Sequence, residues 1–182
     1  MTAPPASRYH VFRTKLGYCG VLQTGARVVR TCTPVGSPGR AVEMLAPPIG
    51  ANTEATPLLR RAEKYLRSFF DGDPRRLGAP EWLEFPPTGA FFGAVYRQLM
   101  KVPAGKVVTY RALAKKAGSP GAGRAVGQAM AANPLAPIIP CHRVVRSDGS
   151  LGGYSAEGGL ALKRLLLERE GVSFDERGRV RF

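Results

Sequence analysis

Acidic residues are missing from the middle of this 182-residue chain: no Asp or Glu occurs between Glu84 and Asp148. The formal net charge is +14. A surface with charge of one sign attracts a polyanion and steers its association, so this gap favours a nucleic-acid partner. A merely solubilising, Arg-rich composition is the alternative that charge alone leaves open. The basic residues inside the gap are Arg97, Lys101, Lys106, Arg111, Lys115, Lys116, Arg124, Arg143 and Arg146.

Cysteine is scarce, with three residues at positions 19, 32 and 141. An odd number without framework spacing argues against a disulfide-stapled secreted protein and predicts a reduced intracellular setting. Cys19, Cys32 and His10 show no paired CxxC spacing, so no metal is assigned. We expect Cys19 and Cys32 to behave as buried small hydrophobic residues.

Long apolar runs are also absent. No segment approaches the roughly 18 apolar residues of a membrane span, and residues 1–15 lack the apolar region of a signal peptide. Because 44% of the residues are hydrophobic, the chain can bury a core in one large domain or two small ones. These features predict a cytoplasmic protein with no membrane partner, nucleoid-associated if the source is prokaryotic.

The N-terminal half is predicted to be rich in strands. Short β-prone runs over 9–12, 20–23 and 27–30 are broken by glycines. Residues 34–56 are rich in Pro, Gly and Ala and are predicted to form a loop. Residues 57–70 carry apolar side chains at i, i+3, i+4 and i+7, which predicts an amphipathic helix.

A linker predicted over 80–87 divides the chain into an N-terminal domain, 1–85, and a second domain, 86–182. In the second domain, Thr88 is predicted to cap a helix. Thr109 is predicted to cap a shorter one.

A further helix is predicted over 122–132, after a turn at 119–121, and such a helical pair is typical of a helix-turn-helix. Gly123 and Gly127 each cost this helix roughly 1 kcal/mol relative to Ala. The small residues suit either close packing against another helix or entry into a minor groove about 6 Å wide. Arg124 is its one long cationic side chain.

The hexapeptide PCHRVV, residues 140–145, places the Cys141 thiol next to an imidazole and an Arg. The thiolate is the nucleophilic form of Cys, and neighbouring cations lower its pKa. The motif therefore predicts a reactive thiolate. A Cys–His hydrolase is one alternative, although such enzymes bring their His from distant sequence.

Three segments together carry a family resemblance: PCHRVV, the GRAVGQAMAANP helix before it and GGYSAEGGLALKRLLLEREG after it. They resemble the O6-alkylguanine-DNA alkyltransferases, also called methylated-DNA–protein-cysteine methyltransferases. The likeness is specific from about 91 to 171, including VPAGKVVTY at 102–110, and only general in the N-terminal half. It implies an α+β fold: an N-terminal ribonuclease-H-like α/β domain and a C-terminal helical, winged helix-turn-helix-like DNA-binding domain.

The resemblance also implies a reaction. A guanine alkylated on O6 is flipped out of the duplex into a pocket, and the cysteine sulfur displaces guanine from the alkyl carbon. The protein is left irreversibly S-alkylated, so each molecule acts once and no cofactor is needed. The implied partner is double-stranded DNA carrying O6-alkylguanine, bound through its minor groove by a monomer, with O4-alkylthymine as an optional second substrate.

Four residues take catalytic roles by this resemblance. Cys141 is the alkyl acceptor, and His142 is the base that takes the thiol proton through a water. Glu170 orients the histidine; its alternative is a solvated acid at a helix end. Asn133 fixes the turn and supports the active-site hydrogen bonds; its alternative is a plain helix C-cap before Pro134.

Other residues are assigned to DNA and pocket. Tyr110 contacts the guanine edge and helps rotate the nucleotide at its phosphate, and Arg124 enters the base stack. The full DNA-binding set is Tyr110, Arg124, Ala125, Gly127, Lys115 and Lys116. The pocket set is Met130, Val144, Tyr154 and Ser155, of which Met130 and Tyr154 also suit simple core positions.

The chain departs from the family pattern after Ser155. Ala156-Glu157 precedes Gly158-Gly159 where many relatives run to the glycines directly, so we expect a longer loop beside the pocket to affect the bulk of accepted alkyl groups. A non-reacting alkyltransferase-like lesion sensor is the other alternative. Such sensors lack the acceptor cysteine, whereas this chain retains an intact PCHR.

Overall fold

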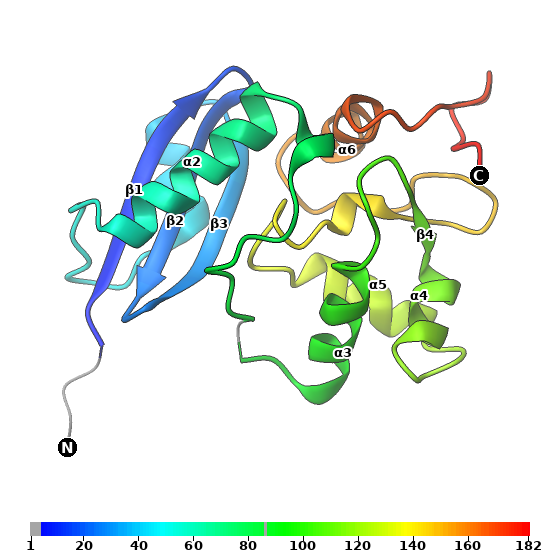
Figure 1. Ribbon diagram of the computed structural model, residues 1–182, viewed down its shortest axis with the longest axis horizontal. Coiled ribbons are helices and arrows are strands. Elements are labelled where there is room, and N and C mark those ends of the chain that lie inside the picture. The colour runs from blue at the N-terminus through cyan, green and yellow to red at the C-terminus, as the bar shows by residue number, and fades with distance from the viewer. Residues whose placement is uncertain (1–4, 86) are drawn as a thin grey trace. The chain divides into compact units, whose positions relative to one another are not determined.

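A computed structural model describes residues 5–85 and 87–182. The chain forms two compact units (Figure 1). One holds the described residues through Asp73 together with 77–85, and the other holds 74–76 together with the residues from 87 onward. The predicted α+β class, with a small sheet unit followed by a helical unit, is confirmed. Expectations for residues 1–4, and for residue 86 in the linker, lie outside the described residues.

The first unit is built on an antiparallel sheet of order β1-β2-β3. Its strands are β1 (Ser7–Thr14), β2 (Gly17–Thr24) and β3 (Arg27–Val35). Each of the three predicted β-prone runs lies inside one of these longer strands. The strands are joined by turns of two residues, so sequence neighbours pair directly from Ser7↔Thr24 to Thr14↔Gly17 between the first two strands.

The predicted loop over 34–56 is wrong in part, because it contains the helix α1 (Pro38–Leu45). The Ser37 side chain accepts a hydrogen bond from the Arg40 N–H, and Pro38 occupies the first helical turn, where its missing N–H costs nothing. The high Pro and Gly content hid this short helix. It approaches the sheet closely: a Cβ at Gly20 would lie 2.6 Å from the Leu45 side chain.

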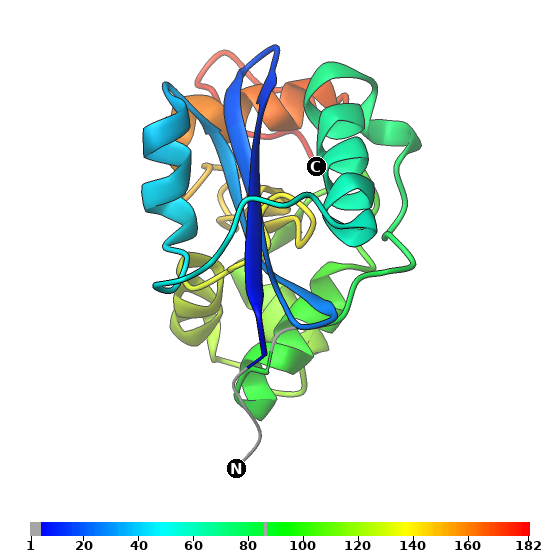
Figure 2. The same ribbon diagram turned by 90° about the vertical axis from the view of Figure 1, so that its left-hand side faces the viewer.

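The two helices of this unit cover opposite faces of the sheet (Figure 2). Leu22 packs with Leu45 of α1. On the other face, His10 Nε2 lies 2.9 Å from Glu63 Oε2 of α2 (Pro57–Asp71). The predicted helix over 57–70 is confirmed, with Thr56 as its N-cap.

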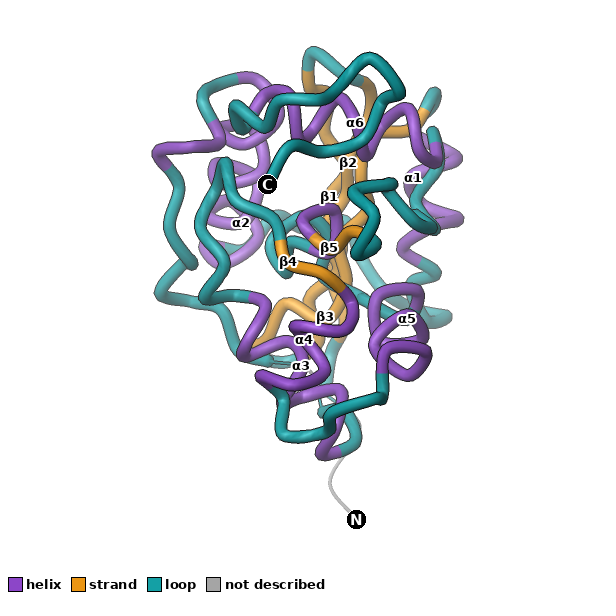
Figure 3. Tube along the Cα trace, turned by 90° about the vertical axis from the view of Figure 1, so that its right-hand side faces the viewer, coloured by secondary structure: helices purple, strands orange, loops and turns teal. Residues whose placement is uncertain are grey.

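The second unit is mostly helical. Its elements are a 3₁₀ turn at Pro74–Arg76, α3 (Ala90–Leu99), β4 (Val108–Thr109), α4 (Tyr110–Lys116), α5 (Gly123–Ala131), a 3₁₀ turn at Cys141–Arg143, β5 (Val144–Val145) and α6 (Gly159–Arg169). The strands β4 and β5 run parallel and lie side by side (Figure 3). Their register pairs Val108 with Val144 and Thr109 with Val145, so α4 starts directly beside the end of β5.

One of the two predicted caps in this unit is correct. Thr109 accepts a hydrogen bond from the Ala112 N–H at 3.1 Å and begins α4. Thr88 does not cap α3, because the helix begins one residue later and Gly89, which has no side chain, takes the N-cap position. In the described part of the chain, no helix is long and apolar enough to cross a membrane.

Truncating Leu45, the side chain through which α1 packs on the sheet, should destabilise the first unit. Leu45 is fully buried, so Leu45→Ala should lower the free energy of unfolding by about 2–5 kcal/mol. Ile49→Ala is the matched control because Ile49 is fully exposed, and it should leave the unfolding midpoint in urea unchanged. Equal midpoints for the two variants would contradict the packing of α1 on the sheet.

Candidate active site and nucleic-acid interface

Cys141 is the first residue of a 3₁₀ turn. Its N–H donates to the Ile139 carbonyl at 2.8 Å. The side chain is only 5% exposed, yet it lines a pocket of about 580 Å³. This volume is within the range of small-molecule sites. Because the turn is tight, the two residues that follow Cys141 reach one common partner.

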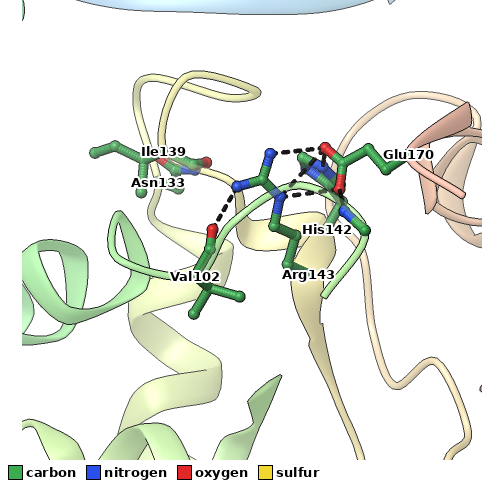
Figure 4. A network of polar contacts seen from close by, with 7 residues as sticks. Val102, Asn133, Ile139, His142, Arg143 and Glu170 are labelled. Atoms are coloured by element: carbon green, nitrogen blue, oxygen red, sulfur yellow. Dashed lines mark hydrogen bonds and ion pairs between the residues drawn. The ribbon is translucent and has the colours of Figure 1, made fainter. Parts of the chain in front are cut away.

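That partner is the carboxylate of Glu170 (Figure 4). His142 Nε2 lies 2.9 Å from Glu170 Oε1. The Arg143 guanidinium donates to the same carboxylate through Nε at 2.9 Å and Nη2 at 2.8 Å, and through Nη1 to the Val102 carbonyl at 2.6 Å. Glu170 is 1% exposed, so the alternative of a solvated acid at a helix end is wrong.

Gly105 allows the chain to approach this carboxylate. Its φ is +78°, a conformation that side-chain-bearing residues avoid. A Cβ there would lie 2.8 Å from the Glu170 carbonyl oxygen. The VPAG turn, which begins at Val102, therefore packs closely against the end of α6 and contributes the Val102 carbonyl to the site.

The network fixes the charge states of its members. Burial alone would raise the pKa of Glu170, but hydrogen bonds from His142 and Arg143 outweigh it and lower the pKa to about 2. For His142, burial lowers the pKa, and the hydrogen bond to Glu170 opposes this only in part. Near neutral pH, Glu170 is therefore ionised and His142 is a neutral imidazole that can accept a proton.

The predicted resting thiolate at Cys141 is not what the structure favours. Burial raises the pKa of the thiol, while the Asn133 side chain and the charge of Lys163 lower it by less. A neutral thiol is the resting form, since desolvation penalises the thiolate. Nucleophilic chemistry at this sulfur therefore needs a base, and the neutral His142 is adjacent in sequence.

Lys163 is a second buried charge, on α6, and it is fully buried. Its ammonium donates to the carbonyls of Val144 at 2.6 Å, Leu151 at 2.5 Å and Gly153 at 3.3 Å. Burial lowers its pKa to about 8. Lys163 thereby ties β5, which follows the Cys141 turn, to the loop that forms one wall of the pocket.

Asn133 organises the segment before the cysteine. Its Nδ2 donates to the Ile139 carbonyl at 2.8 Å, and its Oδ1 accepts from the Leu135 N–H at 3.0 Å. The helix α5 ends at Ala131 and its C-cap is Ala132, one residue before Asn133, so the alternative of a plain C-cap at Asn133 is wrong. Asn133 stabilises the turn that leads to Cys141 through these two hydrogen bonds.

Most of the residues predicted for DNA and pocket meet at one surface. The pocket is lined by α5, the start of α4, the cysteine and the loop 152–155; the lining residues are Tyr110, Gly123, Arg124, Gly127, Met130, Ala131, Cys141, Arg146, Gly152, Gly153, Tyr154 and Ser155. Val144 is not among them, because it is fully buried and its carbonyl accepts from Lys163. Ala125, Lys115 and Lys116 also lie outside the lining, the two lysines being exposed at the end of α4.

The two glycines of α5 do not serve internal packing. A Cβ at Gly127 would meet nothing within 4 Å, and one at Gly123 would only reach the Tyr110 side chain at 4.0 Å. Val126, Ala129 and Met130 make the buried face. The glycines face the pocket instead, which favours the groove interpretation of this helix over close helix packing.

Comparisons with known proteins agree with this site. A family model described as the 6-O-methylguanine DNA methyltransferase DNA-binding domain matches residues 90–172. A methylated-DNA–protein-cysteine methyltransferase of Saccharolobus solfataricus is 45% identical over 111 residues, which are 61% of this chain and 68% of that protein. The chain belongs to the methylated-DNA–protein-cysteine methyltransferase family. The Methanosarcina acetivorans member is 40% identical over 115 residues, 62% of this chain and 69% of that protein.

Solved structures from the same family share the fold across both units. The crystal structure of Mycobacterium tuberculosis OGT in complex with DNA has a TM-score of 0.71 at 27% identity, covering 90% of this chain and 92% of that one. The O6-methylguanine-DNA methyltransferase of Pyrococcus kodakaraensis has a TM-score of 0.70 at 28% identity, covering 90% and 99%.

Sequence reasoning missed two charged members of the site. Arg143 was counted as a surface cation and as a neighbour that lowers the thiol pKa, but its buried pairing with Glu170 was not predicted. Lys163 was not considered, and its signal was its spacing: it lies three and four residues before the buried Leu166 and Leu167, on the inner face of α6. Among the described residues, no group of three or more His, Cys, Asp or Glu is placed to hold a metal ion.

Glu170 should make the free energy of unfolding depend on pH. Its folded pKa of about 2 lies below the ordinary value of 4.5, so its stabilisation is complete above about pH 4.5 and is lost as the pH falls toward 2. Glu170→Gln should lower the free energy of unfolding at pH 7 by about 3–5 kcal/mol, because Arg143 stays buried without its anion.

The difference in unfolding free energy between wild type and Glu170→Gln should shrink between about pH 4.5 and pH 2, as measured by urea titration. Glu168→Gln is the control, since Glu168 is exposed and pairs with Arg164 on the helix surface. A constant difference across this range would contradict the charge state given to Glu170.

Proposed function

We propose that the protein repairs DNA by transferring the alkyl group of O6-alkylguanine to the sulfur of Cys141 in a single turnover, with O4-alkylthymine as an optional second substrate. One observation carries this proposal. The thiol lines a pocket large enough for an extruded base, and the residue that follows it belongs to a buried His–Glu pair. Membership of the methyltransferase family supplies the reaction class. We place the DNA-binding and alkyl-acceptor functions in a domain over 86–182 and a strand-rich supporting domain over 1–85.

The chemistry needs one proton transfer and one displacement. Glu170 holds His142 through Nε2, which leaves Nδ1 as the nitrogen that takes the thiol proton, through a water molecule. The sulfur forms a bond to the alkyl carbon as the bond from that carbon to O6 breaks, and the leaving guanine is protonated. The product is a neutral thioether, so the protein does not return to its starting state. No cofactor takes part.

The buried charges of Glu170 and Lys163 are already in place to stabilise the charges that form during the reaction. The Glu170 carboxylate stays ionised and stabilises the imidazolium as it forms, in the manner of an acid–His–nucleophile relay. The Lys163 ammonium lies close enough to lower the pKa of Cys141, so it stabilises the thiolate as the proton leaves. Asn133 fixes the turn that leads to Cys141 by donating to the Ile139 carbonyl.

DNA is bound through the minor groove by α5, whose glycines offer little bulk. Arg124 enters the base stack and fills the space left by the flipped nucleotide, while Tyr110 contacts the guanine edge and its phosphate. Ala125, Gly127, Lys115 and Lys116 contact the duplex, the lysines at phosphates. Met130, Tyr154 and Ser155 line the pocket that encloses the base, whereas the Val144 carbonyl is engaged by Lys163. We propose that the protein acts as a monomer in the cytoplasm, on the nucleoid in a prokaryote.

Label transfer tests the proposal directly. Mixed with a duplex that carries methyl-labelled O6-methylguanine, the protein should take up one label per molecule on Cys141, and Cys19 and Cys32, both buried, should stay unlabelled. Cys141→Ala should take up none yet still bind the duplex. If the wild type binds the duplex without label transfer, the protein is a lesion sensor. If it shows no binding and no transfer, the alkyltransferase and the lesion sensor are both excluded, and the Cys–His hydrolase is the alternative to test.

Substitutions at Arg124 should separate space filling from charge. Arg124 is exposed at the pocket edge, so Arg124→Ala should slow repair of O6-methylguanine in duplex more than Arg124→Phe or Arg124→Tyr, because a bulky group can still occupy the base stack. The measurement is the second-order rate of label transfer for each variant at one salt concentration. Equal rates for the three variants would remove the intercalating role.

A further inference from the structure

Arg146 occupies the mouth of the pocket. It follows β5 directly, its side chain is exposed, and it lines the pocket together with Cys141. The parallel register of β4 and β5 determines its position. Because Thr109 pairs with Val145, the residues that follow them, Tyr110 and Arg146, lie side by side. The Cys141 pocket therefore has a phenol and a guanidinium at the same edge.

The backbone at Arg146 is fixed by a tight turn. The Arg146 N–H donates to the Ser150 carbonyl at 2.8 Å, and the Arg146 carbonyl accepts from the Gly149 N–H at 3.1 Å. Asp148 lies within this turn, and its Oδ1 accepts from the Ser150 N–H at 3.0 Å and hydroxyl at 2.7 Å. The neighbouring carboxylate is thus held by Ser150. The Ser150 hydrogen bonds and, less strongly, the charge of Arg146 lower the pKa of Asp148, but no ion pair joins Asp148 to the guanidinium among the described residues.

The other cations around the pocket are committed elsewhere or placed on another wall. Arg143 is saturated by Glu170 and the Val102 carbonyl. Lys163 is surrounded by carbonyls. Arg124 projects from α5. Arg146 takes part in no ion pair among the described residues, and its charge reaches the Tyr110 phenol, where it opposes the rise in pKa that burial causes.

This placement suits one part of a flipped nucleotide. When the base enters the pocket, its own phosphate stays at the mouth, because the sugar joins the two. A guanidinium offers two parallel N–H donors that match phosphate oxygens, and such charge-assisted pairs are stronger than neutral hydrogen bonds. A phenol beside it supplies a third donor.

Building on the function proposed above, we infer that Arg146, with the Tyr110 hydroxyl, binds the phosphate of the flipped alkylguanine nucleotide. Arg146 is therefore a substrate-binding residue that favours alkylguanine within DNA over the free base. It acts on the nucleotide backbone and not on the alkyl group, so its effect is the same for small and large alkyl substituents.

Two substrates that differ in the phosphate test this inference. One is a duplex containing O6-methylguanine, and the other is the free base O6-benzylguanine, which has no phosphate. Arg146→Gln should slow label transfer from the duplex at subsaturating DNA by about tenfold or more and should reduce the slope of log affinity against log salt by about one. Transfer from the free base should keep the wild-type rate.

Matched variants sharpen the comparison. Arg146→Lys should recover part of the duplex rate, since it keeps the charge but loses the fork. Arg177→Gln removes the same charge from an exposed position in the C-terminal turn and should leave the duplex rate within about twofold of wild type. An equal loss with both substrates would show that Arg146 shapes the pocket, and no loss with either would show that it binds nothing; each result overturns the inference. A wild type that accepts no label from either substrate would instead refute the proposed function.

Discussion

The buried carboxylate of Glu170 is the interaction on which the site depends. An isolated ionised carboxylate in a protein interior costs several kcal/mol, and only complete hydrogen bonding offsets that cost. Here the required partners are His142 and Arg143. Satisfying one charge therefore joins three segments distant in sequence: the end of α6, the turn that carries Cys141, and the VPAG turn whose carbonyl at Val102 takes the remaining guanidinium donor. The position of the nucleophile follows from this electrostatic requirement.

The helix α6 carries a second buried charge of opposite sign. Lys163 is satisfied by backbone carbonyls and not by an acid, so it stays positive without forming an ion pair that would cancel its field. Its charge consequently remains effective at Cys141. One helix thus supplies the anion that holds the base and a cation that favours the thiolate, from residues seven positions apart on its inner side.

Local signals in the sequence identified much of this arrangement. Adjacent residues such as Cys141 and His142 need no fold to be recognised as a pair, and Thr109 caps its helix by a contact within three residues. The failures are of another kind. The direction of the Cys141 pKa depends on burial, which sequence neighbours do not reveal, and a cation-rich motif suggested the opposite. Arg143 and Lys163 look like surface charges until the fold encloses them. The helix α1 was hidden because Pro and Gly, usual in loops, here occupy the one turn of a helix where they are tolerated.

The raised pKa of the Cys141 thiol bears on how the protein survives until it meets damage. Oxidants and small electrophiles attack thiolates far faster than thiols. A nucleophile that rests protonated and 5% exposed is shielded from peroxide and from stray alkylating agents. For a protein that is consumed by one reaction, this shielding decides what fraction of the molecules is still active when the correct base arrives. Burial of the sulfur thus preserves its reactivity until a substrate enters the pocket.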